Sequence, residues 1–187
     1  SISPNGKEIA FAYKGDIYKV ATTGGVATRL TTHEAYDTTP MWSPDGSKIA
    51  FVSDRYYGSR DIYVMNANGG AAKRVTTHST SESILAFSPD GRYIYYTAHI
   101  QDPASSALFP TARLNEVYKV PVEGGRSIMV MATPVSMGAI SADGRQLIYE
   151  DIKGFENVWR KHHTSSVTRD IVLYDFKSKQ YKPLATW

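Results

Sequence analysis

Ser43-Pro44-Asp45-Gly46, followed by the largely apolar run Lys48-Ile49-Ala50-Phe51-Val52-Ser53, is the stretch on which the rest of the chain is patterned. In such a turn proline presets an early position, aspartate bonds nearby backbone, and glycine accepts a positive φ. An apolar run directly after it is typical of a hairpin. The same turn and run recur at 3–11, 88–96 and 141–149. Four copies indicate an array of repeats. A period of roughly 40 to 50 residues built from short strands favours propeller blades.

Each copy continues with a second shared segment, an acid followed by β-branched and aromatic residues, as expected of a half-buried strand. These segments are 16–20, 61–65, 116–120 and 170–174. A glycine pair follows the first three, and 176–179 stands in its place in the fourth. The sequence predicts a last short strand in every copy, at 28–31, 73–76, 126–129 and 181–184.

A further strand, directly before the turn, completes the repeat at 40–42, 84–87 and 137–140. The first copy has only Ser1-Ile2 in this place. We therefore predict an all-β fold, a partial β-propeller of about four blades. Each blade has four antiparallel strands, and the first is incomplete. The blades span approximately 1–36, 37–82, 83–134 and 135–187. A β-sandwich is the alternative, and four aligned copies of two separate turn motifs argue against it.

The chain has 187 residues, a formal net charge of +3 and no cysteine. Its cations are scattered, so we expect no nucleic-acid partner. No apolar stretch reaches the ~20 residues of a membrane helix, so we expect no membrane insertion. Neither end has the atypical capping unit of a finished array, so we expect a piece of a longer protein. Its exposed blade edges would allow self-association with a second copy.

Length variation is confined to one set of connections, those between the second and third strands and those between blades. Variable loops on one face of a repeat protein are often its binding face. We predict that this face contacts a substrate or the rest of a parent protein. The candidate contact residues are Arg55, Tyr56, His78, Arg113, Arg160, Lys161, His162 and His163.

No catalytic residue, metal site or cofactor is predicted in this chain. His162-His163 lies near Asp151 and Glu156, but adjacent histidines in extended chain point opposite ways and rarely bind one ion. Ser165-Ser166 follows closely, but no Gly-x-Ser-x-Gly elbow or oxyanion-hole loop accompanies it. The repeated acids Asp16, Asp61 and Asp170 are expected to make structural bonds.

The repeat resembles the PD40 type of WD40-like repeat, found in TolB and tricorn-type propellers. A narrower resemblance is carried by 9–18, by 30–37 and by 156–171. The most distinctive part of the third stretch is Trp159-Arg160-Lys161-His162-His163-Thr164-Ser165-Ser166. These stretches look like the amino-terminal propeller of tricorn-like serine peptidases of the S41 family. The resemblance implies a six-bladed propeller, a second propeller, a PDZ domain and a catalytic core whose nucleophile lies beyond Trp187.

What the resemblance implies is a non-catalytic propeller of an exported, periplasmic serine peptidase, one that guides or gates peptide substrates and scaffolds the catalytic domain. Whether the parent is an enzyme rests on the resemblance, and this chain alone is expected to hydrolyse nothing. Two alternatives stay open: a TolB-like periplasmic interaction propeller, and a propeller that caps an α/β-hydrolase peptidase.

Overall fold

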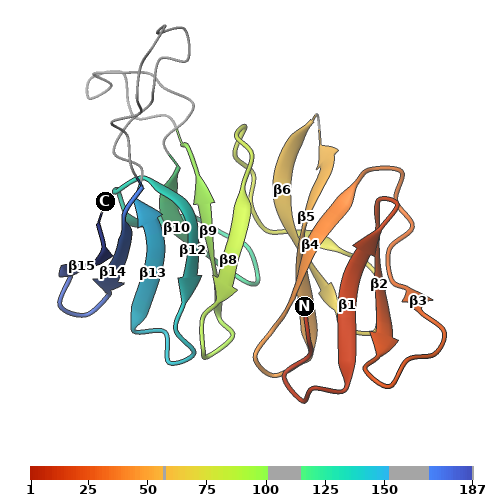
Figure 1. Cartoon of the computed structure of the whole chain (residues 1–187). Coiled ribbons are helices and arrows are strands. Elements are labelled where there is room, and N and C mark those ends of the chain that lie inside the picture. The colour runs from red at the N-terminus through yellow and green to blue at the C-terminus, as the bar shows by residue number, and fades with distance from the viewer. Residues whose placement is uncertain (57, 101–114, 152–168, 187) are drawn as a thin grey trace, which may run out of the picture.

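Four antiparallel sheets follow one another along the chain, as Figure 1 shows. They come from a computed structural model that describes residues 1–56, 58–100, 115–151 and 169–186. Within each sheet every strand pairs with the next one along the chain. The prediction of an all-β, propeller-like array with an incomplete first sheet is confirmed.

The strands keep the predicted order. The first sheet contains β1 (Glu8–Tyr13), β2 (Asp16–Ala21) and β3 (Thr28–Arg29). The second contains β4 (Asp37–Trp42), β5 (Lys48–Tyr56), β6 (Ser59–Asn66) and β7 (Lys73–Arg74). The third contains β8 (Ser83–Phe87), β9 (Tyr93–Ala98), β10 (Glu116–Pro121) and β11 (Ile128–Met131). The fourth contains β12 (Val135–Ile140), β13 (Gln146–Asp151), β14 (Ile171–Asp175) and β15 (Tyr181–Ala185). In the first sheet, an isolated bridge between Ile2 and Ile9 replaces the innermost strand.

The repeated turn is held by the same hydrogen bonds in all four copies. Its serine Oγ donates to the Asp or Asn two residues later, at 2.8 Å from Ser3 and 2.6 Å from Ser43, Ser88 and Ser141. The same Oγ accepts a backbone N–H from the residue five positions later, at 2.9 Å in every copy. The turn glycines have φ between 68° and 72°, which a side chain disfavours. The same bonding in all four copies explains why closely similar tetrapeptides form the turn before β1, β5, β9 and β13.

Asp175 supplies the turn that the fourth copy forms without a glycine pair. Its carboxylate accepts backbone N–H groups from Lys177 at 3.0 Å and from Ser178 at 2.7 Å. Lys179 then takes the left-handed conformation at φ 56°. An Asx-type turn therefore does here what glycine does elsewhere.

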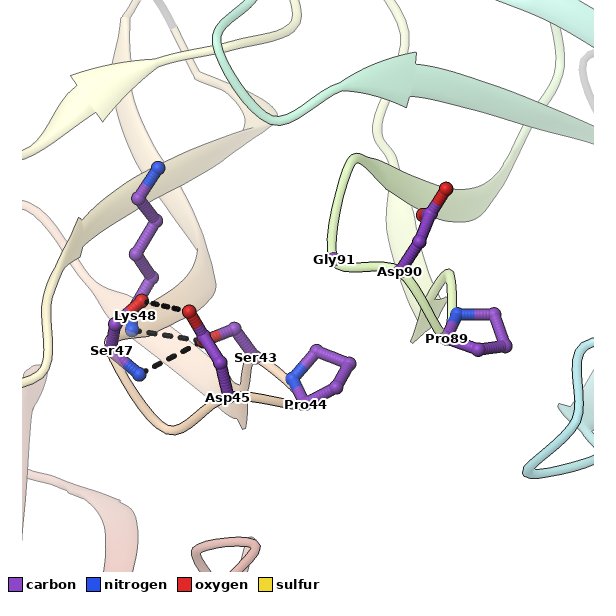
Figure 2. Close-up of a pocket in the computed structure, with 8 residues that line it drawn as sticks. All are labelled: Ser43, Pro44, Asp45, Ser47, Lys48, Pro89, Asp90 and Gly91. Atoms are coloured by element: carbon purple, nitrogen blue, oxygen red, sulfur yellow. Dashed lines mark hydrogen bonds between the residues drawn. The ribbon is translucent and has the colours of Figure 1, made fainter.

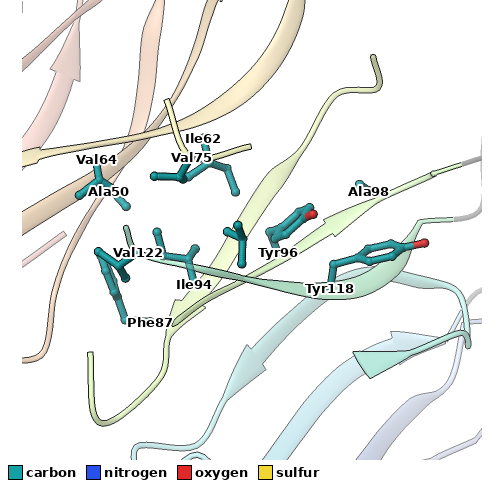
Figure 3. Packing of buried hydrophobic residues seen from close by; sticks show 11 residues of the cluster. Ala50, Ile62, Val64, Val75, Phe87, Ile94, Tyr96, Ala98, Tyr118 and Val122 are labelled. Atoms are coloured by element: carbon teal, nitrogen blue, oxygen red, sulfur yellow. The ribbon is translucent and has the colours of Figure 1, made fainter. Parts of the chain in front are cut away.

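The hydrophobic core lies between successive sheets. Because side chains alternate along a strand, each inner sheet presents one apolar set to each neighbour. In the second sheet, Ile49 and Phe51 pack toward the first sheet, while Ala50 and Ile62 pack toward the third. Figure 3 shows the cluster between the second and third sheets. A stacked aromatic pair recurs on the first three sheets with ring centroids 5.8 Å apart: Phe11–Tyr18, Phe51–Tyr63 and Tyr96–Tyr118.

Several strand bounds differ from the prediction. The innermost strand of the second sheet begins at Asp37 rather than at residue 40, so Asp37 belongs to a strand and not to the link. β3 and β7 have two residues instead of four. They are short because a side-chain hydroxyl, and not a backbone carbonyl, accepts the next backbone N–H of the neighbouring strand. Thr31 accepts from Ile17 at 2.9 Å, and Thr76 accepts from Ile62 at 2.8 Å. In the third sheet, β11 lies two residues later than predicted.

Candidate functional site

The described links between sheets, 30–36, 75–82 and 132–134, lie at one end of the sheets, opposite the Ser-Pro-Asp-Gly turns, which are at the bottom of Figure 1. We call this the loop-bearing end. In the second sheet and its links it comprises residues 30–37, 53–61 and 74–82. Three of the predicted contact residues, Arg55, Tyr56 and His78, lie there beside a group of buried carboxylates. Arg113, Arg160, Lys161, His162 and His163 lie outside the described residues.

An aspartate–arginine pair recurs at this end of the first two sheets. Asp16 accepts Arg29 at 2.6 Å and Asp61 accepts Arg74 at 2.9 Å, each arginine standing on the outermost strand of its sheet. Both carboxylates are buried. Asp16 and Asp61, two of the repeated acids, therefore each bond an arginine of their own sheet, which agrees with a structural role.

Arg55, a predicted contact residue, is engaged inside the protein. Its guanidinium donates to both carboxylate oxygens of Asp37, at 3.2 and 2.6 Å. It also lies over the rings of Phe51 and Tyr63, 5.3 and 5.1 Å from their centroids. Only 14% of its side chain is exposed, and Asp37 is fully buried. Arg55 can meet a ligand with its exposed edge alone unless this pair opens.

Tyr56 and His78 are more accessible. The Tyr56 ring is half exposed and carries the Arg74 guanidinium 4.2 Å from its centroid. His78 is partly buried, and its charge acts on Asp61, whose pKa is raised by burial and lowered by Arg74, Ser59 and His78. An aromatic face, an arginine and a histidine thus surround one buried carboxylate. Such a group suits the peptide bonds and acidic or aromatic side chains of a peptide.

Glu82 is the residue of this end that the sequence prediction missed. It is 3% exposed, and one carboxylate oxygen accepts the Thr76 hydroxyl and the Ile62 N–H, the latter at 3.2 Å. Burial, the largest effect, raises its pKa to about 8. The signal was present in the repeat, because Glu82 precedes Ser88 by the same six positions that separate Asp37 from Ser43.

The opposite end has a small hollow of about 180 Å³ between the turns of the second and third sheets, drawn in Figure 2. Its carboxylates, Asp45 and Asp90, are saturated by their own turns. The Ser43 hydroxyl, with bonds from Ser47, holds the pKa of Asp45 at about 2. The Ser88 hydroxyl likewise lowers the pKa of Asp90. These acids are turn-forming groups, which matches their predicted role.

The described part of the chain holds no group of three or more His, Cys, Asp or Glu side chains able to bind a metal ion. Nor does any helix in it have the length and apolar character needed to cross a membrane.

The sequence of the chain matches a known protein family and a curated relative. The model of the tricorn protease N-terminal beta propeller domain matches residues 2–187. The TolB homolog of Chlorobium chlorochromatii (strain CaD3) is 44% identical over 62 residues, which are 29% of this chain and 14% of that protein.

Two solved structures share the fold. The crystal structure of the tricorn protease matches with a TM-score of 0.71 at 15% identity, over 98% of this chain and 22% of that one. TolB from Acinetobacter baumannii matches with a TM-score of 0.70 at 19% identity, over 98% of this chain and 42% of that one. The chain therefore spans less than half the length of each of these three proteins.

Proposed function

Because the chain belongs to the tricorn protease N-terminal β-propeller family, we propose that it guides or gates peptide substrates for an exported serine peptidase and scaffolds its catalytic domain. The family match over residues 2–187 is the observation that carries this proposal. The chain itself supplies no catalysis. Its partners would be peptides and the remaining domains of the parent protein, its location the periplasm or another exported compartment, and its exposed blade edges would allow self-association.

The loop-bearing end is the surface proposed to meet peptides. Tyr56 offers an exposed aromatic face, and Arg74 beneath it adds positive charge. Aromatic and arginine side chains dominate binding energy at protein interfaces. His78 lies on the adjoining link, and Arg55 presents the exposed edge of its guanidinium from the end of β5.

Fluorescence anisotropy with a set of short labelled peptides tests this proposal. We expect saturable binding to the unaltered chain and a loss of roughly fivefold or more in affinity for Tyr56→Ala and for His78→Ala. Tyr181→Ala is the matched control, because Tyr181 is a similarly exposed tyrosine at the opposite end of the fourth sheet. Absence of saturable binding, or an equal loss in all three variants, would contradict a peptide-guiding role for this end.

A TolB-like interaction propeller is the second candidate. The identity to the TolB homolog, 44% over 62 residues, favours it. In that case the loop-bearing end would bind a folded protein rather than extended peptides. The anisotropy experiment separates the two, because a surface shaped for a folded partner gives no saturable signal with short peptides.

A further inference from the structure

Asp37 and Glu82 occupy equivalent places in successive copies but have different surroundings. Each stands six residues before its turn serine. Asp37 is neutralised by Arg55, which stands twelve residues after Ser43. Twelve residues after Ser88 stands Ile100, an apolar side chain packed against the core between the second and third sheets. Glu82 is therefore the buried acid that corresponds to Asp37, but it has no counterpart of Arg55 to pair with.

The contacts of Glu82 join the link 75–82 to β6. Its backbone N–H donates to Arg60 O at 2.9 Å, and its side chain reaches Thr76 and Ile62. Oε2 makes the side-chain bonds, while Oε1 is buried with no hydrogen-bond partner among the described residues. The Glu82 carboxyl group thus adds to the bonds that hold the link 75–82 to β6, which are the Val75 N–H to Ile62 O, the Glu82 N–H to Arg60 O and the Ile62 N–H to the Thr76 hydroxyl. One of its two oxygens is unsatisfied among the described residues. A buried carboxylate in this state is costly unless it carries a proton.

The charged and titratable groups around Glu82 come from every neighbouring element. Asp61 on β6 raises its pKa and Arg74 on β7 lowers it. Tyr96 on β9 is close enough for Glu82 to raise the pKa of the phenol. His78, within the link, acts on Asp61. Arg74 is already paired with Asp61. Among the described residues, neither the sheets nor the link therefore supplies a positive charge that pairs with Glu82.

We propose that Glu82 binds and releases a proton in the folded protein and thereby controls how firmly the link 75–82 is held against β6. With its proton, the carboxyl group stays buried and bonded to Thr76. Without it, the carboxylate is drawn toward water, and the link loosens from the second sheet. Since 75–82 is part of the loop-bearing end, rising pH opens this end between the second and third sheets.

The direction follows from linkage. The pKa of Glu82 is raised in the folded state, from 4.5 to about 8. The stabilisation of the closed link is therefore complete below about pH 4.5 and is lost progressively as pH rises toward about 8. Over that range the opening equilibrium should increase by up to about tenfold per pH unit.

Hydrogen exchange of the segment 75–82 tests the proposal, measured from about pH 5.5 to 9 and corrected for the intrinsic pH dependence of exchange. We expect protection in the unaltered chain to fall steeply up to about pH 8 and then to level off. Glu82→Gln should abolish this slope. Glu123→Gln is the control, because Glu123 is an exposed acid that pairs with Lys48, and it should keep the slope of the unaltered chain. A flat profile in the unaltered chain, or equal slopes in Glu82→Gln, would overturn the proposal.

Direct titration keeps the proposal testable if Glu82→Gln fails to fold. The carboxyl carbon of Glu82 in the isotope-labelled, unaltered chain can be followed by NMR across the same pH range. A midpoint between about 7 and 9 supports the proposal, and a midpoint below about 6 overturns it.

Discussion

Gly144→Ala is the substitution that most directly tests the packing of successive turns. The glycine has φ +69°, and a Cβ placed on it would lie 2.7 Å from both Cδ and Cγ of Pro89 in the preceding turn. The left-handed conformation costs a residue with a Cβ about 1–2 kcal/mol. The overlap with a rigid proline ring adds about 1–3 kcal/mol, the usual cost of overpacking. We expect a total loss of about 2–5 kcal/mol in the free energy of unfolding.

Gly91→Ala is the matched control. Its φ of +68° is nearly identical, but a Cβ there would meet Cδ of Pro44 at 3.9 Å, an ordinary contact. Only the conformational cost of about 1–2 kcal/mol applies. Urea unfolding of the two variants measures the difference from the shift in midpoint at constant slope. Equal losses in both variants would refute the contact between turns.

A double-mutant cycle locates the effect in one pair of residues. Pro89→Ala should restore part of the stability that Gly144→Ala removes, with a coupling energy of about 0.5–3 kcal/mol. Alanine suits this turn position, because Ala142 holds it in the fourth copy, where the turn keeps its serine hydrogen bonds. An additive cycle would show that the strain has another source.

Three further predictions follow from the described contacts and the sequence. Arg55→Met leaves Asp37 buried and uncompensated and should cost about 3–5 kcal/mol in urea unfolding, with partial recovery on adding Asp37→Asn. Failure of that second change to recover stability would contradict the pairing. Ser43→Ala removes the main cause of the lowered pKa of Asp45 and should move its NMR titration midpoint from about 2 toward 3.8. Because a lowered pKa stabilises the fold above 3.8 and loses that effect as pH falls through 2, acid unfolding should begin at higher pH in this variant. The chain alone should not cleave fluorogenic peptides, and turnover that disappears on alanine substitution of Ser165-Ser166 would refute this.

The sequence predicted the strands and turns well because each is decided locally. A Ser-Pro-Asp-Gly turn closes its own hydrogen bonds within five residues, and the apolar alternation after it gives the strand that follows. Strand ends were harder to predict, because they depend on partners distant in sequence. Thr31, for example, ends β3 through a bond to Ile17, which lies on another strand.

The candidate site could be placed in the fold but not described in detail. The variable connections define the loop-bearing end, and its role as a contact surface stays a prediction. Arg55 is predicted as a contact residue from its place in a variable connection, whereas the ion pair with Asp37 shows that its guanidinium is engaged inside the protein. The unusual state of Glu82 arises from its burial and from the lack of an arginine partner like that of Asp37. Neither feature can be read from a single sequence.

The short outer strands bear on how the protein avoids aggregation. A sheet edge recruits foreign strands through its unpaired backbone groups, and β3 and β7 offer only two residues each, one or both of them cationic. In the fourth sheet Pro183 interrupts the donors of β15. β11, with half-exposed Ile128 and Met129, lacks these protections, so it is the rim strand at which fibril-like growth would start.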